Sequence, residues 1–161
     1  MPKGKRGGTE NLAGICGLAA AMKEACDNID VNMPKVAAMR DRLIEGLSQI
    51  PHCALNGDPV NRLPGNVSFC FEGIEGESLL LYLDAMGISA SSGSLDPSHV
   101  LLAIGRIHDV AHGSLRLSIC EYNTEEEIDH ILACVPKVVQ QLRNMSPVWR
   151  DLLNGKREYI L

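Results

Sequence analysis

The beginning of the chain shows hydrophobic positions with the period of an α-helix. One set recurs at alternating steps of three and four, so its side chains share one helix face. Its members are Leu12, Ile15, Ala19, Met22, Cys26 and Ile29. Residues 28–32 are expected to break this helix. A second helix is then predicted, with Pro34 in its first turn and Pro51 after its end. Its apolar face consists of Val36, Met39, Leu43, Leu47 and Ile50.

Beyond Pro51 the pattern alternates between the period of a strand and that of a helix. Residues 67–71 and 115–119 place apolar side chains at every second position, which is typical of half-buried strands. Helices are predicted at residues 77–86, where Gly87 ends the helix, and at residues 97–104. Residues 56–65, NGDPVNRLPG, are typical of turns.

The last predicted helix has a clear start. Thr124 and Glu127 have the spacing of a capping box, in which the hydroxyl accepts from the Glu127 backbone N–H and the glutamate reaches back. Glu125 and Glu126 suit the positive end of the helix dipole, so we interpret residues 125–127 as a capping cluster rather than an acid–base pair. Its apolar face consists of Ile128, Ile131, Leu132, Val135, Val138, Val139 and Leu142.

These elements predict an α+β fold. We expect one domain over residues 1–161, with a short antiparallel or mixed sheet that helices cover mainly on one face. A chain of this length is sufficient for a single hydrophobic core.

Composition and charge argue against several classes of function. The chain has 45% hydrophobic and 22% charged residues, a formal net charge of −5 and a pI near 5.5, which argue against a nucleic-acid partner. No apolar run is long enough to span a membrane, and the amino-terminal MPKGKRGG does not resemble a signal peptide. We therefore expect a cytoplasmic protein.

Six cysteines are irregularly spaced and include no C-x-x-C pair, which argues against a zinc knuckle or a thioredoxin-type motif. Several occupy apolar positions of periodic segments. Most are therefore expected to be reduced and packed.

Residues 88–98, ISASSGSLDPS, form a serine-rich loop between two apolar segments. A mobile polar loop of this kind often carries a reactive group. This loop has no cysteine, histidine or lysine, and Asp96 is its only carboxylate. Its composition alone leaves its purpose open.

Several stretches of the chain resemble a known family. They are RGGTENLAGICGLAAAM, LPGNVSFCFEGIEGESLLLYLDAMGI, LDPSHVLLAIG and AHGSLRLSICEYNTEEEID. In this order they resemble the carboxy-terminal part of the cysteine desulfurases, the NifS and IscS family of pyridoxal-phosphate enzymes. The resemblance implies an aminotransferase-like small domain of the fold type I architecture, which follows a large cofactor domain. It also implies a homodimer with active sites at the subunit interface.

The family removes sulfur from L-cysteine, leaves L-alanine, and holds the sulfur as a persulfide for iron–sulfur cluster assembly or tRNA thiolation. In its S-[LI]-R-[LF]-S strand the arginine binds the substrate's α-carboxylate, and Ser114–Ser118 matches this pattern with Arg116. A guanidinium binds a carboxylate through two parallel hydrogen bonds, a geometry that lysine cannot copy. Without the resemblance, Arg116 would be read as a surface arginine on the solvent face of a strand.

Thr9 is the second residue that the resemblance singles out. In the family's R-x-G-T segment the threonine reaches the cofactor phosphate of the opposite subunit, and residues 6–9 match this segment. Hydroxyl and backbone N–H groups near a helix start suit a phosphate. The alternative for Thr9 is a plain helix N-cap.

Two parts of the family's machinery are absent from the sequence. In the family the serine-rich loop contains a cysteine that accepts the sulfur, whereas here Ser94 runs directly into Leu95 and about six family residues are missing. We therefore expect residues 88–98 to be a truncated mobile loop. The cofactor-binding lysine, its stacking histidine and its aspartate belong to the large domain. Pro2-Lys3-Gly4 is similar to the P-K-G after that lysine, a match as easily due to chance.

The other candidates are weaker. His108 and His112 have the spacing of two metal ligands on a helix, but no third ligand is evident. Cys120 follows the Arg116 strand, and we interpret it as an ordinary strand-end cysteine rather than a reactive one.

Two functions remain open. The chain is either the small domain of a desulfurase, inactive alone and without covalently bound pyridoxal phosphate, or a non-catalytic dimerisation or docking module. Its partners would be a second copy, a chain with the large domain, or an iron–sulfur scaffold. In either case self-association is expected, because the apolar surface lacks its cover.

Overall fold

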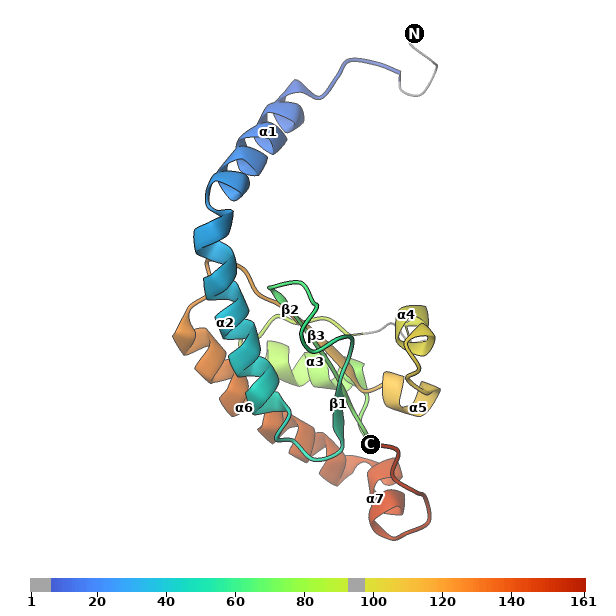
Figure 1. The fold of residues 1–161 in the computed structure, drawn as a ribbon. Coiled ribbons are helices and arrows are strands. Elements are labelled where there is room, and N and C mark those ends of the chain that lie inside the picture. Colours follow the sequence, from blue (N-terminus) through green and yellow to red (C-terminus); the bar gives the residue numbers. More distant parts are fainter. Residues whose placement is uncertain (1–6, 93–97) are drawn as a thin grey trace.

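The protein, described here by a computed structural model over residues 7–92 and 98–161, forms a three-stranded sheet (Figure 1). The helices are α1 (Leu12–Asp27), α2 (Ile29–Leu47), α3 (Gly76–Asp84), α4 (His99–Ala103), α5 (His108–Ala111), α6 (Glu125–Met145) and α7 (Pro147–Leu153). The strands are β1 (Cys53–Leu55), β2 (Asn66–Phe71) and β3 (Ser114–Ser118). The helices α2, α3 and α6 cover one face of the sheet, and the short helices α4 and α5 pack on part of the other. The predicted α+β class is confirmed.

The sheet is antiparallel throughout, with the order β1-β2-β3. The central strand β2 pairs Leu55 with Phe69 on one side and Phe69 with Leu115 on the other. Val67, Phe69 and Phe71 of β2 and Leu115 and Leu117 of β3 are buried, as the sequence pattern predicts. Cys70, predicted on the exposed side of β2, is buried as well. Of the two sheet types expected, the antiparallel one is therefore present.

The main core lies between this sheet and the layer formed by α2, α3 and α6. Apolar side chains of the second and sixth helices pack against those of β2 and β3, including Met39, Leu43, Phe69, Leu115 and Val135. Figure 1 shows α2 and α6 side by side on this face of the sheet. Burial of these side chains supplies the main driving force for the fold.

A smaller cluster lies under α4 and α5. Cys70 follows Phe69 on β2, so its side chain points away from the main core. It packs with Leu101 of α4 and with Val110 and Ala111 of α5. Leu161, in the last residues of the chain, packs against the same cluster.

The first helix differs from the others because none of its residues is buried. In Figure 1, α1 lies beyond the start of α2, at an angle to it, and projects away from the sheet. The expected break at residues 28–32 is much shorter than predicted, since α2 already begins at Ile29. Asn28 separates the two helices, and its side-chain amide donates to the Glu24 carbonyl oxygen at 2.8 Å. Pro34 consequently lies inside α2, not in its first turn.

Three short elements were not predicted: β1, α5 and α7. The second helix also ends at Leu47, before the predicted Ile50. Within the described ranges, no helix has the length and apolar character needed to cross a membrane.

Candidate functional site

Arg116 lies in the middle of β3, where Leu115 and Leu117 on either side of it are buried. Its own side chain is exposed, on the sheet face opposite the α2–α3–α6 layer. Between residues 7–92 and 98–161, its guanidinium has no hydrogen-bond or ion-pair partner. The described part of the chain thus leaves this guanidinium exposed to solvent.

The first residues of the serine-rich loop, 88–92, form what we call its arm, and Ser91 of this arm lies directly beside Arg116. The Ser91 N–H donates to the Arg116 carbonyl oxygen at 3.0 Å, and the Arg116 N–H donates to the Ser91 carbonyl oxygen at 2.6 Å. This exchange is a hydrogen-bonded antiparallel pair, so Ser91 extends the sheet by one residue next to β3. Residues 93–97 of the loop lie outside the described part of the chain, and the predicted mobile loop therefore stays a prediction.

Glycine permits the close approach that holds this arm. The Cα of Gly76 lies so close to Ser92 and to the Ser114 carbonyl oxygen that a side chain there would collide with both. Its N–H donates to the His112 carbonyl oxygen at 2.9 Å. The hydroxyl oxygens of Ser92 and Ser114 are 3.5 Å apart. The start of α3 thus fixes the arm against β3.

Thr9 lies two residues before Asn11, the N-cap residue of α1. The N-cap of α1 is Asn11, whose side-chain oxygen accepts from the Gly14 N–H at 3.1 Å. The alternative reading of Thr9 as the N-cap is therefore wrong. In Figure 1 the amino-terminal end of α1, which Thr9 precedes in the sequence, projects away from the sheet that contains β3. Arg6 of the R-x-G-T match lies outside the described residues.

The described lysines do not form a cofactor site. Lys23 pairs with Asp27 on the surface, Lys35 donates to the Glu121 carbonyl oxygen at 2.9 Å, and Lys156 is 3.7 Å from Asp151. Lys137 lies on the outer face of α6 beside Pro136 and Gln140. None of these four has the buried aromatic and acidic surroundings that a pyridine ring needs. The described residues therefore do not fit covalently bound pyridoxal phosphate.

His108 and His112 face each other across one turn, with ring centroids 4.7 Å apart. No group of three His, Cys, Asp or Glu side chains suited to a metal occurs in the described ranges. The pair is thus a ring contact, and nothing in the described surroundings supplies further ligands.

All six cysteines lie in the described residues, and each is free. The expectation that most are packed holds for only half of them. Cys53 is partly buried and Cys70 and Cys134 are buried, while Cys16, Cys26 and Cys120 are exposed. Burial raises the pKa of the Cys53 and Cys70 thiols, which favours the unreactive protonated form.

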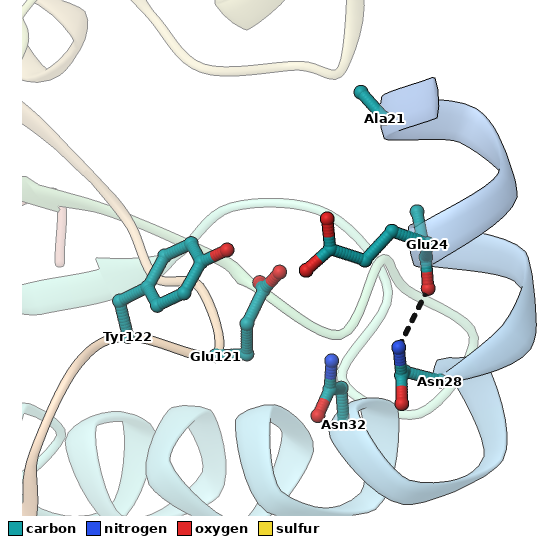
Figure 2. Close-up of a pocket in the computed structure, with 7 residues that line it drawn as sticks. Ala21, Glu24, Asn28, Asn32, Glu121 and Tyr122 are labelled. Atoms are coloured by element: carbon teal, nitrogen blue, oxygen red, sulfur yellow. Dashed lines mark hydrogen bonds between the residues drawn. The ribbon is translucent and has the colours of Figure 1, made fainter. Parts of the chain in front are cut away.

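Two pockets lie beside the end of β3 or the turn that follows it. One of about 590 Å³ lies between Ser89, the end of β3 and the start of α6, and Cys120 is part of its lining. Another, of about 460 Å³, lies between α1 and the turn after β3 (Figure 2). Figure 2 shows the carboxylates of Glu24 and Glu121 directed toward one another in it, with the Tyr122 hydroxyl nearby. Neither pocket contains Arg116 or Thr9.

Comparisons with known proteins identify the family of the chain. The family model "Aminotransferase class-V" matches residues 1–131. The chain belongs to the class-V aminotransferase family. Cysteine desulfurase IscS of Clostridium botulinum is 52% identical over 165 residues, which cover 97% of this chain and 42% of the relative. Cysteine desulfurase NifS of Azotobacter vinelandii is 47% identical over 154 residues, which cover 91% of this chain and 38% of the relative.

Solved structures show the same relationship. A NifS-like protein superimposes with a TM-score of 0.77 at 33% identity, covering 87% of this chain and 36% of the other. The resemblance to part of the cysteine desulfurases is thereby confirmed. This class-V aminotransferase chain spans less than half the length of the relatives it matches.

The burial of two charged residues, Glu72 and Arg143, was not predicted from the sequence. Arg143, at the end of α6, is 3% exposed and donates to the carbonyl oxygens of Glu72, Pro51 and His52 at 3.1, 2.8 and 2.9 Å. Its position next to Leu142 on the apolar face of α6 was the one available sign.

Proposed function

We propose that this chain is the carboxy-terminal small-domain part of a pyridoxal-phosphate-dependent cysteine desulfurase. The complete enzyme would move the sulfur of L-cysteine to an acceptor thiol as a persulfide and release L-alanine. The sulfur would serve iron–sulfur cluster assembly or tRNA thiolation. In this proposal the 161 residues form one domain in a cytoplasmic homodimer.

Arg116 would bind the α-carboxylate of L-cysteine. The supporting observation is its exposed guanidinium, which lies on a rigid strand beside the serine arm and has no partner within the described residues. A positioned guanidinium needs little reorganisation to receive a carboxylate through two hydrogen bonds. Thr9 would contact the cofactor phosphate of the opposite subunit, which agrees with the projection of α1 away from the sheet (Figure 1).

The isolated chain would not carry out this reaction. The nucleophilic cysteine is missing from the serine-rich loop, and the described lysines do not fit the cofactor. A large domain and a sulfur-accepting thiol would have to come from elsewhere.

The alternative is a non-catalytic module that docks on a desulfurase or on an iron–sulfur scaffold. The observation in its favour is α1, whose apolar side chains are exposed along its length, among them Leu12, Ile15 and Leu18. A docking module would bind its partner without using Arg116.

A direct experiment incubates the purified chain with pyridoxal phosphate and L-cysteine. No sulfide should form, and mass spectrometry after borohydride reduction should show no stoichiometric cofactor adduct. Sulfide release at many turnovers per chain would disprove the inactive-alone proposal.

A second experiment distinguishes the desulfurase domain from the docking module. The large domain of the Clostridium botulinum relative is added as a separate chain, and the cofactor absorbance is followed as L-cysteine is titrated. Arg116→Lys should weaken the L-cysteine response by about tenfold or more, since the two-bond geometry is lost. Arg150→Lys, which alters an exposed arginine of α7, is the matched control. Binding of the two chains with an identical response for both variants would favour the docking module.

A further inference from the structure

The last two residues of the chain donate backbone hydrogen bonds to a buried carboxylate. Glu72, at the end of β2, is 4% exposed. Its two carboxylate oxygens accept from successive backbone N–H groups, that of Ile160 at 2.9 Å and that of Leu161 at 3.2 Å. Burial of a carboxylate is costly unless such bonds compensate it. Glu72 is therefore a specific recognition point for the main chain of this segment.

His52 and Trp149 complete the binding site. The His52 ring stacks on Tyr159 at 4.0 Å, and its Nδ1 is 2.6 Å from the Leu161 main-chain oxygen. Trp149 lies edge-on to both rings, 5.4 Å from His52 and 5.7 Å from Tyr159. Three aromatic rings thus enclose the main chain that Glu72 binds.

The bound segment reaches the smaller core cluster. The Leu161 side chain packs against the cluster formed by Cys70 with residues of α4 and α5, namely Leu101, Val110 and Ala111. Nearby, Arg157 lies 3.8 Å from Asp109 of α5, an exposed pair that adds little stability. The segment therefore links the end of β2 to the two helices that follow the serine-rich loop.

The α4–α5 unit has few other attachments. Its connecting residue Arg106 donates to Asn56 Oδ1 at 2.8 Å and to the Leu55 carbonyl oxygen at 2.6 Å. Two backbone hydrogen bonds attach the end of α5: the Gly76 N–H donates to the His112 carbonyl oxygen at 2.9 Å, and the Phe71 N–H donates to the Gly113 carbonyl oxygen at 2.8 Å. The buried apolar contacts of the unit within the described residues are those of the small cluster, since its other large apolar side chains, such as Val100 and Ile107, are exposed. A unit with so little buried apolar surface opens easily.

We propose that residues 159–161 act as a strap that docks in the Glu72 site and holds α4 and α5 against the sheet. The strap thereby sets the position of the helix that leaves the serine-rich loop. The site recognises an extended peptide by its main chain and by an aromatic and a leucine side chain two positions apart. This inference does not depend on the proposed desulfurase activity.

The decisive comparison uses two neighbouring residues of the strap. Leu161→Ala removes the side chain that packs on the small cluster, whereas Ile160→Ala alters a side chain that is 49% exposed. In hydrogen–deuterium exchange of the full chain, Leu161→Ala should speed exchange in residues 99–111 by about tenfold or more. Exchange in α6 should stay unchanged, and Ile160→Ala should resemble the unaltered protein.

Docking itself is tested through Trp149, the single tryptophan of the chain. Glu72→Gln should shift its fluorescence emission and loosen α4 and α5, while Glu158→Gln, an equal charge change at an exposed residue, should not. In a variant that ends at Glu158, the added peptide Arg-Glu-Tyr-Ile-Leu should restore both signals. The proposal is overturned if Leu161→Ala and Ile160→Ala exchange alike, or if the truncated variant keeps full protection in residues 99–111.

Discussion

Arg143 is the most tightly held charged residue of the protein's described part. Besides its three carbonyl acceptors, its guanidinium lies 4.1 Å from the ring centre of Trp149. Burial lowers the pKa of this guanidinium below its ordinary value, an effect that Cys53 and then Glu72 partly oppose. Through these contacts the end of α6 is joined to the turn before β1 and to the end of β2.

Arg143→Lys should therefore destabilise the fold although the charge is kept. One ammonium group cannot reach three diverging carbonyl oxygens and stack on an indole, so buried acceptors are left without donors. We expect a loss of about 2 kcal/mol or more in the free energy of unfolding, measured by urea denaturation. Arg150→Lys should change it by less than about 0.5 kcal/mol, as is usual for exposed positions. Equal midpoints for the two variants would contradict this role.

The sequence predicts the exposure or burial of some residues but not of others. The exposure of Arg116 follows from strand alternation, because its neighbours Leu115 and Leu117 are apolar. The burial of Arg143 and Glu72 does not, because charged residues are normally exposed and the carbonyl and N–H partners come from distant segments. Only the folded chain brings these partners together.

At the scale of elements, the start of α6 is set by local sequence. The capping box is confirmed: the Glu127 N–H donates to the Thr124 hydroxyl at 3.3 Å, and the Glu127 carboxylate accepts from the Thr124 N–H at 3.1 Å. Hydrogen bonds from the Asn123 side chain and then from the Thr124 N–H lower the pKa of Glu127. The charged form of Glu127 is thus the one that stabilises the helix.

Thr124→Ala should lower the free energy of unfolding by about 1 kcal/mol at neutral pH, by denaturant titration. Because the folded-state pKa of Glu127 is depressed, its contribution is present above the ordinary glutamate pKa and is lost as the pH falls through the depressed value. The stability difference between the unaltered protein and Glu127→Gln should therefore shrink below about pH 4. A difference that stays constant with pH would show that the carboxylate charge is irrelevant to the cap.

Element length explains which elements the sequence reveals. The helices α1, α2, α3 and α6 and the strands β2 and β3 contain enough positions to show a period. The missed elements β1, α5 and α7 have 3, 4 and 7 residues, which leaves little room for a pattern, although α4 was predicted with only 5. They exist because tertiary contacts support them: β1 pairs with β2, and Trp149 of α7 packs against Gly73.

At the scale of the whole molecule, the apolar side chains of α1 stand out, because none of them is buried in the fold. The apolar face of α1 consists of Leu12, Ile15, Leu18 and Met22, which are 67%, 53%, 63% and 58% exposed. Between Asn11 and Lys23 the helix carries no charge that would keep this face in water. A continuous apolar surface of this kind normally marks an interface.

The isolated chain should consequently self-associate through α1. Replacing Ile15 and Leu18 by glutamate puts two charges on the face without touching the core, since no residue of α1 is buried. Sedimentation velocity should show a concentration-dependent assembly for the unaltered chain and a monomer for this variant. Glutamate at Val60 and Leu63, two exposed apolar residues of the turn before β2, is the matched control and should leave the assembly intact. Because only the location of the apolar side chains differs between the two variants, equal behaviour would mean that the surface of α1 is not the one that drives association.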